Sequence, residues 1–313
     1  MDVRQLRYFL GVAEAGSFSA ASVRLGIVQP ALSQQVARLE ADLGVALMVR
    51  NSRGIALTSA GEVLRDRATI LLRDLQSTRE AVLTEAGGPV KGSVTVGLPT
   101  TVAMALTLPF LRSMRERHPQ IALHLAETQS GHLLEWLHQG KMDIAILFDT
   151  NGPQARGLEI EPLVTEELHL VSSSGHDPGG NGDCPLSRAL TLPVLLPSRE
   201  HGFRRLLDAQ AAQLGSTWNV VAEVDALPHL KSAVAAGLAH TVLPRSALIR
   251  EIETGLLHSR RICEPVLQRT AVLAVPSGKP SNAAARAVHT LMVELVRDQI
   301  DRGDWSGAAK PTG

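Results

Sequence analysis

The sequence predicts an α/β protein: an N-terminal winged helix-turn-helix and a linker helix, followed by two α/β subdomains. Three observations predict this fold. Apolar residues at helical spacing, interrupted by glycines, divide the first sixty residues into three short helices and a hairpin. A heptad of apolar residues follows, and from Gly92 onward short strands alternate with helices. The predicted domains are 1–58, 59–88 and 92–300, the last divided into subdomain I (about 92–162 and 268–300) and subdomain II (about 163–267).

Composition narrows the class of protein. Hydrophobic residues make up 44% of the 313 positions but aromatics only 3%, so the cores must be aliphatic. The formal net charge is zero, which excludes a polybasic binder but allows a local basic face. Cys184 and Cys263 lie in no CxxC or Cys/His cluster, so we expect no disulfide framework and no metal. No secretion signal and no apolar run of membrane-spanning length is present, so we expect a soluble, cytoplasmic protein with no membrane partner and no cofactor.

The first helices follow from apolar spacing. Leu6, Phe9, Leu10 and Ala13 predict a helix over 3–14 that ends at Gly16. A second helix is expected over 17–25. After the turn at 26–29, Pro30 is expected to open a third helix that runs to about Leu43. Two short apolar runs around the Arg/Asn/Gly turn at 50–54 predict a β-hairpin, the wing.

The polar face of the third helix and the wing carry side chains that read DNA. Glutamine pairs bidentately with adenine, and arginine with guanine or phosphate. The N-terminal end of such a helix enters the major groove. Arg38 as a merely solvated charge, and Arg50 paired with a nearby acid, remain alternatives. Up to Ser59 there are six arginines and four acids, a net charge of +2, which is a weak signal. The first lysine is Lys91, so this end uses arginine only, and codon composition explains that preference equally well. The predicted contacts are Gln29, Pro30, Ser33, Gln34, Arg38, Arg50 and Arg53.

The linker helix is predicted from 59 onward. Ser59-Ala-Gly-Glu62 matches the S-x-x-E capping box, and a heptad seam follows. Because charges of both signs border the seam, we expect a homodimer coiled coil, with ordinary core as the alternative reading. The linker ends at Gly87-Gly88-Pro89. The seam consists of Leu64, Ala68, Leu71, Leu75, Thr78 and Val82.

From Gly92 onward the pattern is strand, helix, strand, helix, strand, which predicts a parallel sheet. We expect the tail from Asp301 and the Gly-rich loop 175–185 to be loose. The first series has strands around 94–96, 121–126 and 144–148 with helices at 101–118 and 132–139. The second has strands at 168–173, 194–196, 220–224 and 241–243 with helices at 203–214 and 227–236, before a strand at 270–275 and a helix at 283–299.

Ligands of α/β domains bind near the carboxyl ends of strands, so the loops after each strand carry the candidate site. Threonine hydroxyls and helix N-terminal N–H groups suit a carboxylate. Arg199 or Arg204 would complete an anion site, unless each is only a solvent or interdomain salt bridge. Thr100 and Thr101 have the alternative role of helix caps. The candidates are Thr100, Thr101, Val102, Ser130, Phe148, Ser198, Arg199, His201 and Arg204.

Motifs that would indicate catalysis are missing from the sequence. The eleven histidines have no metal-ligand spacing, and no GxSxG, GxGxxG or Walker motif occurs. The remaining alternative is a solute-binding or enzyme domain whose N-terminal segment only oligomerises it.

One string of residues carries a resemblance to a known family. It runs through Ser17-Phe-Ser-Ala-Ala-Ser22, Gln29-Pro-Ala-Leu-Ser-Gln-Gln-Val36, Leu39-Glu40, Leu43-Gly44, Arg50, Arg53-Gly54 and Leu57-Thr-Ser-Ala-Gly61. With the linker helix behind it, the chain resembles the LysR-type transcriptional regulators over almost its whole length. Residues 97–111 and Pro197-Ser-Arg-Glu-His201 are similar to the nitrogen-assimilation-control branch.

The resemblance implies several further properties. The α/β part would have a periplasmic-binding-protein type II-like fold, and the protein would bind dyad operator DNA as homodimers that assemble into a homotetramer. RNA polymerase is an expected further partner. A small, anionic inducer would shift the two subdomains and so change DNA binding. The sequence gives neither the operator, nor the inducer, nor the sign of regulation.

Overall fold

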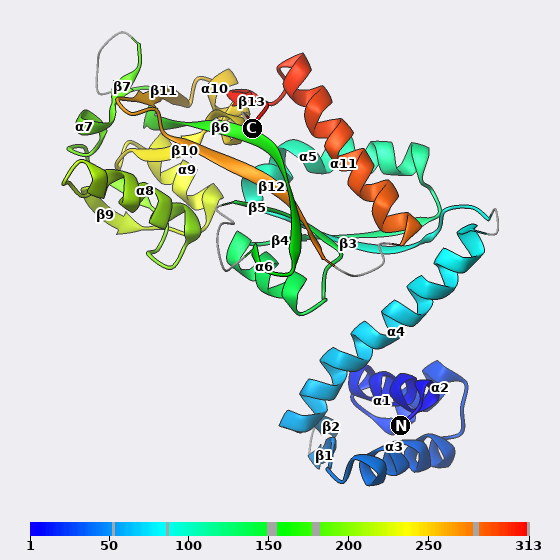
Figure 1. The fold of residues 1–313 in the computed structure, drawn as a ribbon. Helices are drawn as coiled ribbons and strands as arrows, with labels where there is room; N and C mark the ends of the chain where they lie inside the picture. The colour runs from blue at the N-terminus through cyan, green and yellow to red at the C-terminus, as the bar shows by residue number, and fades with distance from the viewer. Residues whose placement is uncertain (52–53, 86–87, 149–154, 177–181, 278–281, 312–313) are drawn as a thin grey trace. The chain divides into compact units, whose positions relative to one another are not determined.

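The computed structural model of the chain describes residues 1–51, 54–85, 88–148, 155–176, 182–277 and 282–311. It forms two compact units, Met1–Gly88 and Pro89–Gly313, and each is described by itself (Figure 1). Along the described residues, no helix combines the length and the hydropathy needed to cross a bilayer.

The first unit is the predicted winged helix-turn-helix. Its buried core joins the first and third helices through Phe9, Val12, Leu32, Val36 and Leu39. Glycines in the left-handed conformation end the first three helices, as their positions predict. The third helix begins one residue earlier than expected, with proline at its second position. The elements are α1 (Val3–Ala15), α2 (Phe18–Leu25), α3 (Gln29–Leu43), β1 (Met48–Asn51), β2 (Gly54–Leu57) and α4 (Ser59–Glu85).

The wing is fixed to the helices at both strands. On β1, the Glu40 carboxylate of α3 accepts hydrogen bonds from the N–H groups of Leu47 and Met48, at 2.7 and 3.1 Å. On β2, the Ile55 N–H donates to the Gly16 carbonyl at 2.8 Å. Only glycine fits at position 54, because φ is 125° and a Cβ would lie 2.6 Å from the Gly16 carbonyl oxygen. The direction of the wing is therefore set by α3 and by the turn between α1 and α2.

The cap of α4 differs from the predicted capping box. Thr58, not Ser59, caps the helix, because its hydroxyl accepts from the Gly61 N–H at 3.0 Å. The same hydroxyl donates to the Ala46 carbonyl at 2.8 Å, which ties the helix start to the residues before the wing.

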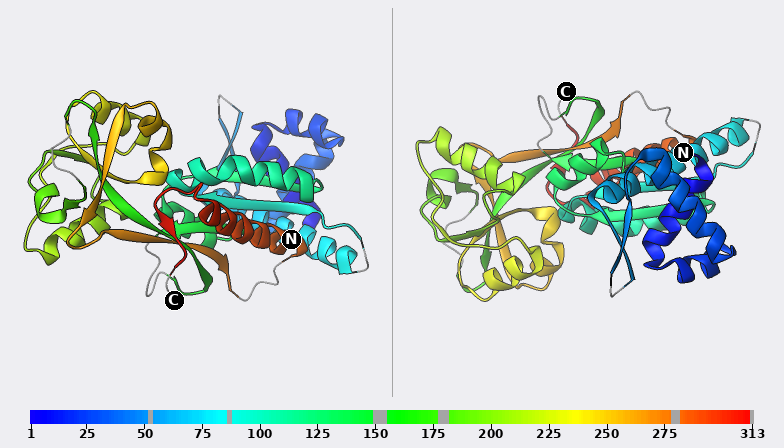
Figure 2. Two further views of the ribbon diagram at one scale, coloured as in Figure 1. Left: turned by 90° about the horizontal axis from the view of Figure 1, so that it is seen from above. Right: turned by 90° about the horizontal axis from the view of Figure 1, so that it is seen from below.

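Subdomain I of the second unit is built on a mixed sheet (Figure 2). β3 pairs in parallel with β4 and β5, as expected, but β12 runs antiparallel to β5 and β6. The parallel sheet predicted for the first series of strands is therefore confirmed, and the strand at 270–275, whose direction was not predicted, is antiparallel to its neighbours. Its elements are β3 (Gly92–Leu98), α5 (Thr100–Arg117), β4 (Ile121–Glu127), α6 (Ser130–His138), β5 (Ile144–Phe148), β6 (Leu158–Ser173), β12 (Gln268–Pro276) and α11 (Ala283–Arg302).

Subdomain II is built around the second half of β6. β10 and β11 both pair antiparallel with this half, and β8 and β9 form a short parallel pair beside it. The sequence predicted only the last six of the sixteen residues of β6, and it missed β11. The elements are β7 (Cys184–Pro185), α7 (Leu186–Ala189), β8 (Val194–Leu196), α8 (Gly202–Gln213), β9 (Val220–Glu223), α9 (Leu227–Ala235), β10 (Thr241–Pro244), η2 (Arg245–Ala247), α10 (Ile249–Glu253) and β11 (Leu257–Cys263).

The C-terminal tail is packed, so the expectation of a loose tail was wrong. Trp305 is only 1% exposed and belongs to the core of subdomain I. Beyond it, β13 (Ala308–Ala309) pairs antiparallel with β6. Part of the loop over 175–185 is also ordered, since β7 pairs with β11; residues 177–181 of that prediction lie outside the described residues.

His169 on β6 makes stability depend on pH. Its ring is 6% exposed, and neither ring nitrogen has a hydrogen-bond partner among the described residues. Burial, reinforced by Arg245, lowers the pKa of His169 below its ordinary value of 6.5. Below about pH 6.5 the His169 ring is protonated in the unfolded chain but stays neutral in the folded chain. The free energy of unfolding therefore decreases as pH falls below about 6.5.

We predict that His169→Gln flattens the fall in melting temperature between pH 7.5 and pH 5.5, because glutamine does not titrate. Differential scanning calorimetry measures this. The exposed His229→Gln serves as the control and should keep the wild-type slope. A His169→Gln protein that loses as much stability on acidification as the wild type would contradict the assignment.

Candidate functional site

The predicted DNA contacts of α3 lie on its open side. Pro30, Gln34 and Arg38 follow one another at four-residue spacing and are all exposed, as is Gln29, while Ser33 is half-buried. The N-cap Val28 gives no side-chain cap. Pro30 has no N–H, and the Ala31 N–H donates to the Val28 carbonyl at 3.1 Å, so the Gln29 N–H is the group at the start of α3 that can donate to a phosphate.

The wing borders the same helix face. Ser33 and Arg50 line one groove of about 170 Å³ between α3 and β1, and the Arg50 side chain is exposed. The structure thus brings together Ser33 of α3 and Arg50 of β1, while Gln29, Pro30, Gln34 and Arg38 lie outside the groove lining. The predicted contact Arg53 lies outside the described residues.

The predicted seam of α4 divides into two parts. Ala68 is fully buried, and half-buried Leu64 packs against the core of its own unit. By contrast, Leu71, Leu75 and Val82 are 52%, 48% and 66% exposed. Within the described chain, the open part of the seam is therefore its C-terminal part, and Leu64 and Ala68 serve the intramolecular core instead.

In the second unit, a cavity of about 100 Å³ lies where the carboxyl ends of the strands of both subdomains meet. Subdomain I contributes the residues that follow β3 and β4 and the last residue of β5; subdomain II contributes the residues after β8 and β9. An apolar wall faces a rim of hydroxyl and amide groups. The lining is Pro99, Thr100, Thr101, Thr128, Gln129, Ser130, Phe148, Pro197, His201, Gly202, Phe203, Val224, Asp225, Leu227, Leu230, Leu243 and Arg269.

Four helices begin at this cavity: α5, α6, α8 and α9. The N-caps of α5, α6 and α9 are Pro99, Gln129 and Ala226, and none of them forms a side-chain cap. Their first backbone N–H groups are consequently not satisfied by caps and carry the positive end of the helix dipole. This arrangement favours a negatively charged group in the cavity.

Arg269 is the buried charge of the cavity wall. Its side chain is 6% exposed and forms an ion pair with Glu166 at 2.7 Å. The guanidinium also donates to the Thr101 hydroxyl at 2.7 Å, and its carbon lies 3.9 Å from the Phe148 ring centroid and 5.2 Å from that of Phe203. Nη1 has no hydrogen-bond partner among the described residues, so a ligand in the cavity can use it.

His201 faces the cavity as a neutral ring. Burial lowers its pKa, Asp225 opposes this shift, and the Arg269 charge adds to it. Its Nδ1 accepts a hydrogen bond from the Phe203 N–H at 3.1 Å and so caps α8. In the neutral ring the proton is then on Nε2, which leaves one donor.

The structure separates the nine predicted ligand residues into two groups. Thr100, Thr101, Ser130, Phe148 and His201 line the cavity. Ser130 is also structural, because its hydroxyl accepts from the Phe148 N–H at 3.1 Å.

The other four lie elsewhere. Val102 is fully buried in the core of subdomain I. Arg199 is exposed, and neither it nor Ser198 is part of the lining. The Ser198 N–H instead donates to Asp225 at 2.9 Å, and this hydrogen bond lowers the pKa of the Asp225 carboxyl.

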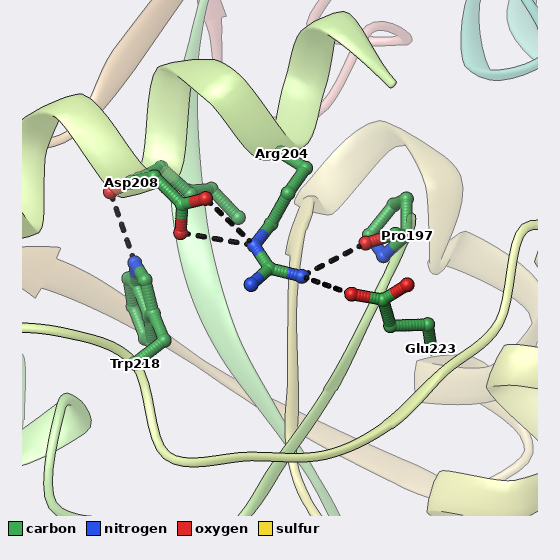
Figure 3. A network of polar contacts seen from close by, with 6 residues as sticks. Pro197, Arg204, Asp208, Trp218 and Glu223 are labelled. Carbon is green, nitrogen blue, oxygen red and sulfur yellow. Dashed lines mark hydrogen bonds and ion pairs between the residues drawn. The ribbon is translucent and has the colours of Figure 1, made fainter. Parts of the chain in front are cut away.

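Arg204 is a structural arginine, contrary to the prediction of an anion site at Arg199 or Arg204. It is buried, and its guanidinium is used within subdomain II (Figure 3). It pairs with Asp208 at 2.9 Å and with Glu223 at 3.3 Å, and it donates to the Pro197 carbonyl at 3.1 Å. The proline follows β8, so Arg204 holds a strand end in place instead of facing the cavity.

Sequence reasoning missed Arg269 and the residues after β9. The loop rule would have found Val224 and Asp225 had it been applied to that strand. In the sequence, Arg269 stands just before the apolar run 270–275 and Glu166 just before 168–173, whereas in the structure Glu166 lies in the middle of β6 and Arg269 near the start of β12. That pairing needs the antiparallel register of β6 and β12, which places Arg269 opposite Glu166. No cluster of metal-ligating side chains occurs among the described residues.

Comparison with known proteins agrees with this architecture. The family "Bacterial regulatory helix-turn-helix protein, lysR family" matches residues 3–62, and "LysR substrate binding domain" matches residues 87–297. The nitrogen assimilation regulatory protein nac of Klebsiella aerogenes is 32% identical over 303 residues, 95% of each chain. OxyR of Escherichia coli strain K12 is 28% identical over 302 residues, 96% of each chain.

Solved structures give the same fold. A variant of Corynebacterium glutamicum OxyR with hydrogen peroxide bound has a TM-score of 0.62 and 29% identity, and covers 97% of each chain. Full-length CbnR in complex with its target DNA has a TM-score of 0.69 at 24% identity, and covers 95% of this chain and 99% of that one. Because one regulatory family matches both units, an N-terminal segment that only oligomerises an enzyme or solute-binding domain is excluded. The chain belongs to the LysR family of bacterial helix-turn-helix regulators.

Proposed function

We propose that this protein is a transcription regulator that reads operator DNA with α3 and the wing and responds to a small anionic molecule in the cavity of its second unit. The DNA half of the proposal is carried by the exposed row of Pro30, Gln34 and Arg38 beside a fixed wing. Glutamine and arginine on such a helix read base edges, and the Gln29 N–H at its start would donate to a phosphate.

Pairing of two chains would place two α3 helices on a dyad site. The exposed part of the seam, Leu71, Leu75 and Val82, supplies the apolar stripe for a homodimer. Two such dimers would make the homotetramer that the family resemblance implies, with RNA polymerase as a partner on the promoter.

We predict that Gln34→Ala weakens binding to DNA from upstream of the protein's own gene by about 1–3 kcal/mol, because a bidentate base contact is lost. Fluorescence anisotropy at several salt concentrations measures this, and the slope against salt should stay the same because no phosphate contact is removed.

Leu75→Asp tests the pairing of two chains separately from the base contacts of α3. It leaves every residue of α3 intact but should convert the protein to smaller species in analytical ultracentrifugation and weaken specific binding. Unchanged affinity in both variants would contradict the proposed use of α3 and α4.

The ligand class follows from the cavity wall. Three uncapped helix starts and Nη1 of Arg269 favour a carboxylate or similar anion, whereas Phe148, Leu227, Leu230 and Leu243 favour an apolar body. Cavities of about 150 Å³ accept benzene, so a cavity of this size suits a molecule of one ring or less. We therefore place a small, partly apolar carboxylate in the cavity.

A cysteine-based peroxide response is the rival that the OxyR relatives raise. The two thiols of this chain are unsuited to it. Cys184 pairs with Ile262, one position before Cys263, so the two cysteines point to opposite faces of the β7–β11 pair. Cys184 is buried, and desolvation together with Glu264 raises the pKa of Cys263, which keeps its thiol protonated.

We predict that benzoate raises the melting temperature more than its neutral isostere benzamide does, and that Arg269→Gln abolishes this difference. At ten times Kd the stabilisation is about 1.4 kcal/mol, or a few degrees. Arg199→Gln, at an exposed position outside the cavity, is the control and should preserve the difference. An equal response to benzoate and benzamide in the wild type would contradict the anionic class.

A further inference from the structure

Glu166, the partner of Arg269, makes four polar contacts with three residues. Its side chain is 1% exposed. Oε2 accepts from Nε of Arg269 at 2.9 Å and pairs with Nη2 of the same residue at 2.7 Å. Oε1 accepts from the Ser246 hydroxyl at 2.5 Å and from the Trp305 indole N–H at 2.8 Å. Every strong acceptor position of this buried carboxylate is therefore used.

The donors to Oε1 come from different parts of the unit. Ser246 lies in η2 of subdomain II, and Trp305 lies in the tail, which packs into subdomain I. The tail is also bound along its backbone: Ala308 lies opposite Glu166 in the β13–β6 pairing, and the Glu167 N–H donates to the Gly307 carbonyl at 3.2 Å. The last residues of the chain thus contact the carboxylate that orients the cavity arginine.

We infer that Trp305 is a positioning residue for the ligand cavity: through Glu166 it sets the place of the Arg269 guanidinium, and hence the affinity for anions. Trp305 is absent from the cavity lining, so its effect passes through the carboxylate alone. This inference rests on the proposed function for its ligand, but the chain Trp305–Glu166–Arg269 is open to test without any ligand.

The hydrogen bonds of Glu166 restrict the orientation of its carboxylate. With both oxygens occupied, Glu166 has a single orientation, and Arg269 follows it into place between the Phe148 and Phe203 rings. Loss of the indole N–H leaves Oε1 with the Ser246 hydroxyl only. The carboxylate then gains a second orientation, and the guanidinium loses the fixed geometry that a hydrogen bond from Nη1 to a ligand requires.

The ligand-free test uses the full chain labelled with 5-fluorotryptophan and one-dimensional ¹⁹F NMR. The protein has three tryptophans, so three resonances are expected, each assigned by substitution with phenylalanine. Arg269→Gln should shift the Trp305 resonance, because Glu166 lies between the two residues.

Arg204→Gln is the matched control, since it alters the other buried arginine. It should move the resonance of Trp218, whose indole N–H donates to the Leu207 carbonyl at 2.9 Å on the same helix as Arg204, and leave Trp305 unchanged. A Trp305 resonance that does not respond to Arg269→Gln would overturn the inference.

The ligand test uses benzoate and benzamide with Trp305→Phe, which keeps the aromatic packing and removes the N–H. Titration calorimetry should show benzoate bound roughly threefold to tenfold more weakly and benzamide unchanged. In an Arg269→Gln background, Trp305→Phe should have no further effect, because both act through one guanidinium.

Equal weakening of both ligands, or an effect that persists without Arg269, would mean that Trp305 only stabilises the fold, and the inference would be wrong. If the wild type itself does not distinguish benzoate from benzamide, the proposed ligand class fails instead, and the ¹⁹F measurement alone decides the coupling of Trp305 to Arg269.

Discussion

The buried ion pair of Arg269 and Glu166 is the interaction on which the second unit depends. The two side chains are 6% and 1% exposed, and they face each other across β12 and β6, the two strands that join the subdomains. Removing such charges from water costs several kcal/mol per ion, so the pair persists only where further hydrogen bonds satisfy it. Thr101, Ser246 and Trp305 provide these bonds, and each belongs to a different element.

This position connects the pair to both subdomains and to the tail. A ligand changes a conformational equilibrium only by binding one state better than the other. An anion bound at Nη1 of Arg269 uses the guanidinium that Glu166 holds in place, and Glu166 is bonded to subdomain II through Ser246 and to the tail through Trp305. Ligand binding and the relative placement of the subdomains therefore draw on the same hydrogen bonds. In the first unit, the wing is fixed by local hydrogen bonds to Glu40 and Gly16.

The parts of the fold that sequence predicts well are those governed by local rules. Helical spacing and glycine stops located α1 to α3, and the loop rule located five cavity residues, including Thr101 and His201. The failures share a cause, which is long-range pairing. Arg269 meets Glu166 only through the antiparallel register of strands about 100 residues apart, so the sequence pointed to Arg199 or Arg204 instead. Arg199 lies outside the cavity lining, and the partners of Arg204 are Asp208 and Glu223. The tail looked loose because it is rich in glycine, lysine and proline, yet the buried Trp305 and the β13–β6 pairing hold it against subdomain I.

The most direct test of this account replaces the pair by apolar residues. Glu166→Leu alone should lower the free energy of unfolding by about 3–5 kcal/mol, because it leaves a buried arginine unpaired, whereas Glu166→Leu with Arg269→Met should recover most of that loss. Titration calorimetry on the stable double variant is the decisive measurement. The account predicts that it no longer distinguishes benzoate from benzamide. A double variant that still prefers benzoate as strongly as the wild type would show that the buried pair is not the anion-binding element of this cavity.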